Sequence, residues 1–462
     1  MTALDRSIRP PAGPPRPLVL PDFDTLDGSG ELDVRLARRT GVPEVSLRLV
    51  MEAGAGAERP ERRGLASLAA RLLTEGTEDR DAVAMARWLD RLGIGFNASA
   101  GYAVGVLSIH TLSDVFEEAL EFLSAVVRGP TFPDQEVERV RSERLDEIDR
   151  QVDEPATVAG HALIEALYAD GLYGRPTGGV RATVEAITPD DLRGFHTDRY
   201  RPGGAVLFVC GDVESQQVVD AVSRWFGGWE GAAARPTAPP TPAAPDPRVI
   251  LIDRPDSPQA EVRVGTVGVA HGTDDYCAIV LANAILGGLF NSRINMNLRE
   301  DKGWTYGARS AFRFRRGAGP FAVQTAVETA VTADAFEEIL GEIALMRDEL
   351  VGDDEMALAK HALTLSLPLQ FETAAQVTTR ISRQHIYGLS HDYWETYRDR
   401  IEAVTAEQVR EVCRTYLGRD RLTLLTVTDA SAAAQGLERF GDVELRGAKG
   451  PSSDEGAEPE AT

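Results

Sequence analysis

The chain has 462 residues, of which 43% are hydrophobic and 26% charged, and its formal net charge at pH 7 is -23. This length is too great for one ordinary domain and leaves room for two domains of about 200 residues, each with a full core. The composition is that of a globular protein without an apolar run long enough to span a membrane, and the acidic excess argues against nucleic acid or an anionic membrane as a partner.

The N-terminus and the cysteines give two further expectations. Residues 1–18 contain several prolines but no apolar core of a signal sequence, so we expect a cytoplasmic protein. The three cysteines, Cys210, Cys277 and Cys413, are odd in number and far apart. They indicate isolated buried thiols and predict neither a disulfide framework nor a zinc site.

The first half of the chain predicts a unit of strands and helices. Between residues 44 and 51, apolar and polar residues alternate with the period of a strand that has one covered face. An amphipathic helix is predicted over 64–77, because leucines recur at helical spacing and Gly76 stands where a helix C-terminus favours glycine. The elements that follow are a helix around 85–92, a hairpin-like pair near 94–101 and 103–111, and long helices near 113–127 and 134–150.

A capped helix and a buried strand close this unit. Thr188 is a capping residue, followed by proline at the first helical position and by Asp191 at the third. The helix should run to Tyr200, and the apolar run 205–210 reads as a buried strand. The first domain is therefore expected over residues 18–230.

The second half repeats the pattern of the first. Residues 402–410 match 185–193 in the order of their residue types, with Thr405 in place of Thr188, and an apolar strand follows each copy. Self-similarity of this kind indicates an internal duplication of a whole domain.

These observations predict an α+β fold of two homologous domains, each an antiparallel sheet with helices packed on one face. The second domain is expected over residues 248–440. An Ala- and Pro-rich linker over 231–247 should join the domains, and an acidic tail over 441–462 should be disordered.

The frame of residues 64–77 resembles the metal-binding helix of the insulinase (pitrilysin) family of zinc peptidases, which carries His-x-x-Glu-His. The positions of the two histidines are occupied by Ser67 and Arg71, and that of the glutamate by Ala70. Glu147 stands where the family has its third metal ligand. Serine is a poor zinc ligand, alanine cannot act as a base, and a guanidinium repels a cation. The resemblance therefore implies a degenerate site without metal, in which an Arg71–Glu147 salt bridge should replace the zinc.

Residues 287–293 and 298–307 resemble a second signature of the family, in which an arginine and a tyrosine stand seven residues apart. Arg299 and Tyr306 match it in type and spacing. The resemblance implies that they bind the substrate's backbone carbonyl, and a guanidinium and a phenol are suitable donors to a developing oxyanion. Alternatively, Arg299 forms a surface ion pair with Glu300 or Asp301, and Tyr306 packs on the sheet.

The resemblance covers residues 18–440 and leaves three functions to weigh. We favour the substrate-binding, non-metal subunit of a heterodimeric zinc metallopeptidase acting on peptides, whose homologous partner carries zinc and an intact His-x-x-Glu-His. A catalytically inert scaffold similar to the respiratory core subunits is the alternative, and a self-sufficient peptidase is disfavoured by the lost ligands. The acidic residues either line a chamber that favours basic peptides or form an ordinary solvated surface.

Overall fold

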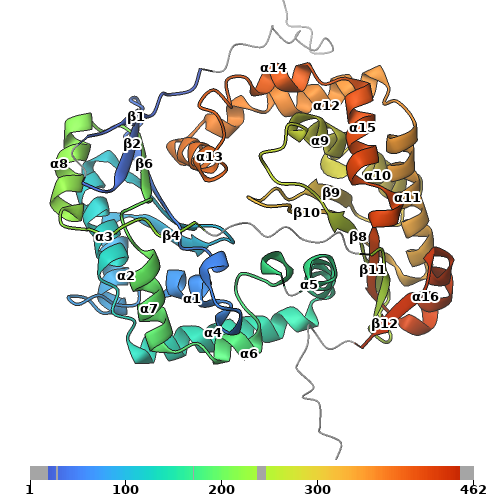
Figure 1. Ribbon diagram of the computed structural model, residues 1–462, viewed down its shortest axis with the longest axis horizontal. Coiled ribbons are helices and arrows are strands. Elements are labelled where there is room, and N and C mark those ends of the chain that lie inside the picture. The colour runs from blue at the N-terminus through green and yellow to red at the C-terminus, as the bar shows by residue number, and fades with distance from the viewer. Residues whose placement is uncertain (1–18, 28–29, 170, 237–245, 448–462) are drawn as a thin grey trace, which may run out of the picture.

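The computed structural model describes residues 19–27, 30–169, 171–236 and 246–447, which form two domains around one sheet each (Figure 1). The first domain contains β1 (Asp24–Thr25), β2 (Asp33–Arg38), β3 (Glu44–Met51), α1 (Leu65–Leu72), α2 (Ala82–Leu92), β4 (Gly95–Ala100), β5 (Gly105–Leu112), α3 (Phe116–Arg128), α4 (Asp134–Asp153), α5 (Pro155–Tyr168), α6 (Arg181–Glu185), α7 (Pro189–Arg199), β6 (Val206–Gly211) and α8 (Ser215–Phe226). The second contains β7 (Val249–Asp253), β8 (Gln259–Val267), α9 (Tyr276–Asn283), α10 (Arg293–Asn295), β9 (Ala308–Phe312), β10 (Pro320–Glu328), α11 (Thr332–Asp348), α12 (Asp353–Leu365), α13 (Ala374–Ile386), α14 (Tyr397–Glu402), α15 (Ala406–Tyr416), β11 (Thr423–Thr428), α16 (Ala430–Leu437) and β12 (Val443–Arg446).

The two sheets share one strand order, which confirms the duplication and the α+β class. The orders are β1-β2-β6-β3-β5-β4 and β12-β7-β11-β8-β10-β9. The helices α7 and α15 begin at equivalent threonines, Thr188 and Thr405, each of which accepts a hydrogen bond in a capping box. The prediction of antiparallel sheets is wrong for the pairings of β6 with β2 and of β11 with β7. Strands β6 and β11 return by helical crossovers and run parallel to β2 and β7, so both sheets are mixed.

The two segments predicted to be irregular have different outcomes. Val443–Arg446 forms β12, which pairs parallel with β7 and completes the edge of the second sheet. The predicted start of the disordered tail at residue 441 is therefore wrong, because the open edge of β7 offers ladder hydrogen bonds to these residues. Residues 448–462 of the tail and 237–245 of the linker lie outside the described residues, and 231–236 contain no helix or strand.

Each sheet is covered on both faces, because each domain sends one helix to the other. The main cores lie between each sheet and its own helices. The second face of the first sheet, which includes Val106 and Phe208, packs against Ile381 and Ile386 of α13. The second face of the second sheet packs in the same way against α5, through Leu163 and its apolar neighbours. The sequence predicted helices on one face of each sheet. The second face is covered by a helix from the other domain (Figure 1).

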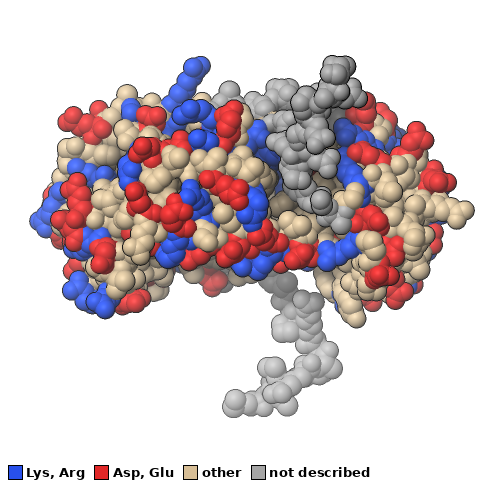
Figure 2. All heavy atoms as spheres, turned by 90° about the horizontal axis from the view of Figure 1, so that it is seen from below, with Lys and Arg blue, Asp and Glu red and all other residues tan. Residues whose placement is uncertain are grey.

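The helical segment Tyr276–Asp301 is long and apolar enough to cross a membrane, and 61% of its most apolar window is buried inside the protein. Its apolar side chains belong to the core of the second domain, which accounts for its composition. On the face shown in Figure 2, acidic side chains are spread over the outer surface of both domains, among lysines and arginines.

The exchange of α5 should contribute measurably to stability. Leu163 is 2% exposed, and it packs so closely on β8 that a Cβ at Gly265 would lie 2.8 Å from its Cδ2. We expect Leu163→Ala to lower the free energy of unfolding by roughly 2–5 kcal/mol, because the cavity left between the domains cannot fully close. Urea unfolding measures the change, and Leu358→Ala, at a 47% exposed position on α12, is the control. Equal effects of the two substitutions would contradict a stabilising role for the exchanged helix.

Candidate functional site

Helix α1 carries three of the predicted site residues and is held at its start by a partly buried carboxylate. Glu58 accepts hydrogen bonds from the backbone N–H groups of Gly64, at 3.1 Å, and Ala66, at 2.6 Å. Burial raises the pKa of Glu58 to about 7, although the two hydrogen bonds lower it. Gly64 has φ of +103° and lies against the backbone of 178–179, where a Cβ would be 3.0 Å from the Gly178 carbonyl oxygen. Glycine is therefore required where α1 begins.

The helix is shorter than predicted. It ends at Leu72, and the chain leaves it in a turn in which the N–H of Glu75 bonds to the carbonyl of Leu72. The carbonyl of Gly76 accepts from the N–H of Thr131, which draws the following residues away from the helix axis. The former motif nevertheless lies wholly within α1.

The predicted Arg71–Glu147 salt bridge is present and bidentate. The Arg71 Nη1 and Nη2 atoms each lie 2.9 Å from one carboxylate oxygen of Glu147, which is on α4. Arg144, one turn earlier on α4, donates to the same carboxylate at 3.0 Å and to the Gly178 carbonyl at 2.9 Å. The hydrogen bond from Arg71, followed by that from Arg144, holds the pKa of Glu147 below its usual value despite partial burial. The prediction is confirmed, and Arg144 adds a second cation that it did not include.

These residues do not fit a zinc ion. Both oxygens of Glu147 are occupied by guanidinium groups, and the neighbouring α1 positions offer only the Ser67 hydroxyl and the buried methyl group of Ala70. In the described part of the chain, no three His, Cys, Asp or Glu side chains are grouped so that they could hold a metal. The arginine therefore supplies the positive charge beside Glu147.

A cavity of about 610 Å³ lies beside this salt bridge, between the two domains. We call it the interdomain cavity. Its walls come from α1, α4 and α5 of the first domain and from β8, β10 and the segment between β9 and β10 of the second. The residues that line it are Ser67, Arg71, Tyr102, Arg144, Gln151, Thr157, Gly160, His161, Leu163, Ile164, Gly174, Pro176, Thr177, Gly178, Arg263, Arg313, Arg315, Pro320, Ala322 and Gln324.

One arginine of the interdomain cavity is held among aromatic rings. The Arg315 guanidinium carbon lies 4.1 Å from the ring centre of Tyr102 and 4.5 Å from that of Tyr173. Nearby, His161 has its pKa lowered by burial and secondly by the charge of Arg144, so it is neutral at pH 7. The fixed positive charge of this cavity therefore comes from arginine.

Arg299 and Tyr306 do not line the interdomain cavity. Arg299 belongs to the π-helical turn Met296–Asp301, where it lies 4.5 Å over the Phe290 ring and 3.6 Å from the Glu300 carboxylate. The ion pair expected under the alternative interpretation is thus present. Tyr306 precedes β9 and is 97% exposed, so the expectation that it packs on the sheet is wrong. Thr325 of β10 fixes this loop by donating to the Gly307 carbonyl at 3.1 Å.

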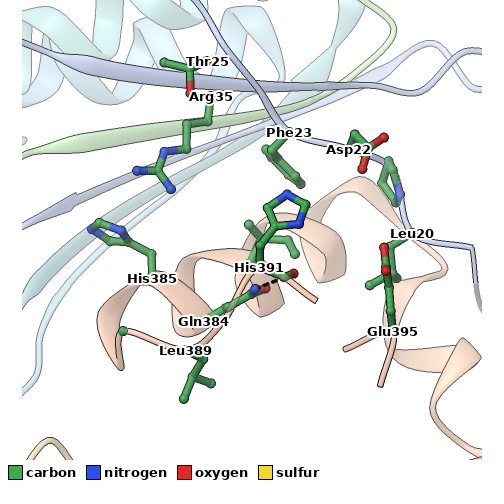
Figure 3. A pocket seen from close by; sticks show the side chains of 13 residues that line it. Leu20, Asp22, Phe23, Thr25, Arg35, Gln384, His385, Leu389, His391 and Glu395 are labelled. Carbon is green, nitrogen blue, oxygen red and sulfur yellow. Dashed lines mark hydrogen bonds between the residues drawn. The ribbon is translucent and has the colours of Figure 1, made fainter. Parts of the chain in front are cut away.

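A second cavity of about 480 Å³ lies between the N-terminal segment, β2 and α13 (Figure 3). His385, His391, Asp22 and Glu395 line it, together with Arg35 and apolar groups. The pKa of His385 is lowered, chiefly by burial, and its ring packs edge-on against Phe208. None of the predicted site residues lines this cavity.

The sequence interpretation missed four arginines of the interdomain cavity: Arg144, Arg263, Arg313 and Arg315. A signal existed for three of them. Arg144 stands three residues before Glu147, on the same face of a helix. Arg313 and Arg315 alternate with phenylalanines after a strand, which places both on one face. Arg263 lies inside an apolar strand, and no local pattern marks it.

The comparisons with known proteins agree with this geometry. A family model described as insulinase (peptidase family M16) matches residues 34–180, and one described as the peptidase M16 inactive domain matches residues 186–363. This chain belongs to the insulinase family of peptidases.

Relatives and solved structures extend the similarity over most of the chain. An uncharacterized zinc protease of Mycobacterium tuberculosis is 28% identical over 415 residues, which cover 89% of this chain and 94% of the relative. The crystal structure of a peptidase M16 inactive domain from Pseudomonas fluorescens matches with a TM-score of 0.82 and 26% identity, over 89% of this chain and 99% of that one. A protease from Helicobacter pylori has the same TM-score at 17% identity, with coverages of 89% and 100%.

The salt bridge makes stability depend on pH in a defined direction. The folded-state pKa of Glu147 is depressed, so its contribution is present above the unfolded value of about 4.3 and is lost as the pH falls through the folded value. Both side chains are about a third exposed, at 38% for Arg71 and 32% for Glu147, which reduces the contribution. We expect Glu147→Gln to lower the free energy of unfolding by about 1–2 kcal/mol at pH 7, with the difference from wild type shrinking below pH ~4.3.

Urea unfolding of both proteins at pH 7 and at several pH values below ~4.3 measures this effect. The control is Glu214→Gln, because Glu214 forms an exposed pair with Arg38. A difference between wild type and Glu147→Gln that stayed constant down to acidic pH would exclude the salt bridge as its source.

Proposed function

We propose that this chain is the substrate-binding, non-metal subunit of a heterodimeric zinc metallopeptidase that acts on peptides. The observation that carries the proposal is the exposure of Tyr306. A phenol that is 97% exposed has no packing role within the described part of this chain and is available to a ligand or a partner. Relatives named zinc proteases support a role in proteolysis, and the residues Ser67 and Arg71 at two ligand positions are the reason that we propose a metal-bearing partner chain.

The proposal divides the labour between this chain and a zinc-bearing partner. A partner with an intact His-x-x-Glu-His would hold zinc and the water-activating glutamate. Arg299 and Tyr306 would donate to the carbonyl oxygen of a peptide held between the chains, and these bonds would strengthen as charge develops on that oxygen. In the family's enclosed chamber four domains take part, and this chain supplies two.

An inert scaffold similar to the respiratory core subunits is the second candidate function. The Arg299–Glu300 contact favours it, because an arginine engaged in a surface ion pair needs no substrate. The ion pair is loose, at 3.6 Å, and exposed pairs of this kind contribute little. A substrate carboxylate or carbonyl can replace such a partner at small cost, so we retain the peptidase subunit as the first candidate. The cytoplasmic location expected from the N-terminal residues stays a prediction.

The proposal predicts an effect of the Arg/Tyr pair in trans. With the zinc-bearing partner present, Tyr306→Phe or Arg299→Ala should lower the turnover of a peptide roughly a hundredfold, because each substitution removes one preorganised donor to the transition state. Assembly, measured by size exclusion, and the zinc content of the partner should not change. Arg224→Ala, which removes an exposed arginine from α8, is the control. Full activity of both pair variants would favour the scaffold.

The chain alone should contain no stoichiometric zinc and should not hydrolyse peptides, because its donor set lacks two ligands and the base. Elemental analysis of the purified chain and a peptide-cleavage assay with and without a chelator measure both properties. The variant carrying Ser67→His, Ala70→Glu and Arg71→His restores the family's motif beside Glu147. It should bind about one zinc per chain. One tightly held zinc in the wild-type chain would overturn the expectation.

A further inference from the structure

The charge of the interdomain cavity is opposite to that of the chain. The whole chain carries a net charge of -23. The residues that line the cavity include five arginines, one histidine and no aspartate or glutamate. A basic cavity in an acidic protein concentrates positive potential at one place, because low-dielectric walls focus the field of the few charges they hold. The interdomain cavity is therefore not the acidic chamber that would favour basic peptides.

Internal carboxylates neutralise only part of this positive charge. Arg71 and Arg144 share the single carboxylate of Glu147. Arg263 is paired with Glu261 at 2.9 Å. Two carboxylates thus serve three guanidinium groups, and neither carboxylate is among the residues that line the cavity.

The other two arginines have no ion pair within the described part of the chain. Arg313 is exposed at the end of β9, and its side chain bonds to no carboxylate there. Arg315 is held by the rings of Tyr102 and Tyr173, and its Nη1 atom is buried without a hydrogen-bond partner among the described residues. Arg315 lines the interdomain cavity, where its guanidinium can donate to an acceptor brought by a ligand.

We propose that the interdomain cavity binds the carboxylates of an acidic peptide segment through Arg313 and Arg315. A guanidinium presents a planar pair of donors that matches a carboxylate, and the aromatic contacts hold that of Arg315 in place before a ligand arrives. The volume of about 610 Å³ lies within the usual range of 300–1,000 Å³ for ligand pockets. The carboxylates can belong to Asp or Glu side chains or to a peptide C-terminus.

This inference rests on the proposed function only in naming a peptide as the occupant. It adds a preference for substrates with acidic residues or a free C-terminus. The Arg299–Tyr306 pair lies outside this cavity, so the two sites can be tested separately.

The test uses the purified full-length chain without a partner and three fluorescein-labelled peptides of equal length. The first alternates Glu and Ala and has an amidated C-terminus, the second is neutral with a free C-terminal carboxylate, and the third alternates Lys and Ala and is amidated. Fluorescence anisotropy gives their affinities. Non-specific attraction to a chain of net charge -23 would favour the lysine peptide, so tighter binding of the first or the second peptide supports the proposal and identifies the source of the carboxylate.

The variants locate the binding. Arg313→Gln, at an exposed position without an ion pair, should weaken the preferred peptide about tenfold or more, since a charged hydrogen-bonded pair is lost. Arg315→Gln should do the same, and thermal unfolding checks that it still folds. Arg87→Gln removes an equal charge from the exposed face of α2, outside the cavity, and should bind the peptide like wild type.

Three results would overturn the proposal. They are equal or tighter binding of the lysine peptide, full affinity of both Arg313→Gln and Arg315→Gln, and saturation by inorganic phosphate without binding of any peptide. Because no partner is present, a failure here leaves the trans effect of Tyr306 untouched. A failure of that effect likewise leaves the peptide affinities intact.

Discussion

The packing of α5 on the second sheet and of α13 on the first holds the two domains in one arrangement. Each sheet has an apolar second face that its own domain leaves bare, and the helix from the other domain covers it. Burial of apolar surface stabilises the packing of both helices. Polar contacts reinforce it: Arg316 after β9 forms a bidentate pair with Glu52 of the first domain at 2.7 and 2.9 Å. The position of α5 then forms one wall of the interdomain cavity, so the site depends on the exchange.

The Arg71–Glu147 salt bridge balances charge at positions where the resemblance to the family implies metal ligands. A carboxylate at Glu147 without a cation would be costly where it is partly buried, and the guanidinium of Arg71 supplies both charge and directed hydrogen bonds. The salt bridge joins helices α1 and α4.

The interdomain cavity and the outer surface differ in their balance of charge. Acidic and basic side chains are mixed on the outer face shown in Figure 2, whereas five arginines and no carboxylate line the cavity where the domains meet. The outer charges are solvated and screened, and they act mainly on solubility and long-range association. The inner charges act on whatever enters the cavity, so the net charge of the chain is a poor guide to its ligand.

The sequence by itself determined the family, the duplication and the degenerate motif, because these depend on residue types at fixed spacings. The threonine caps and Arg71 opposite Glu147 are examples. The tertiary structure decided that β6 lies between β2 and β3, parallel to β2, and that β12 pairs with the open edge of β7. Tertiary structure alone brought Arg144, Arg263, Arg313 and Arg315 together. Composition sums charge over the whole chain, whereas the field in a cavity depends on the few side chains that packing places around it.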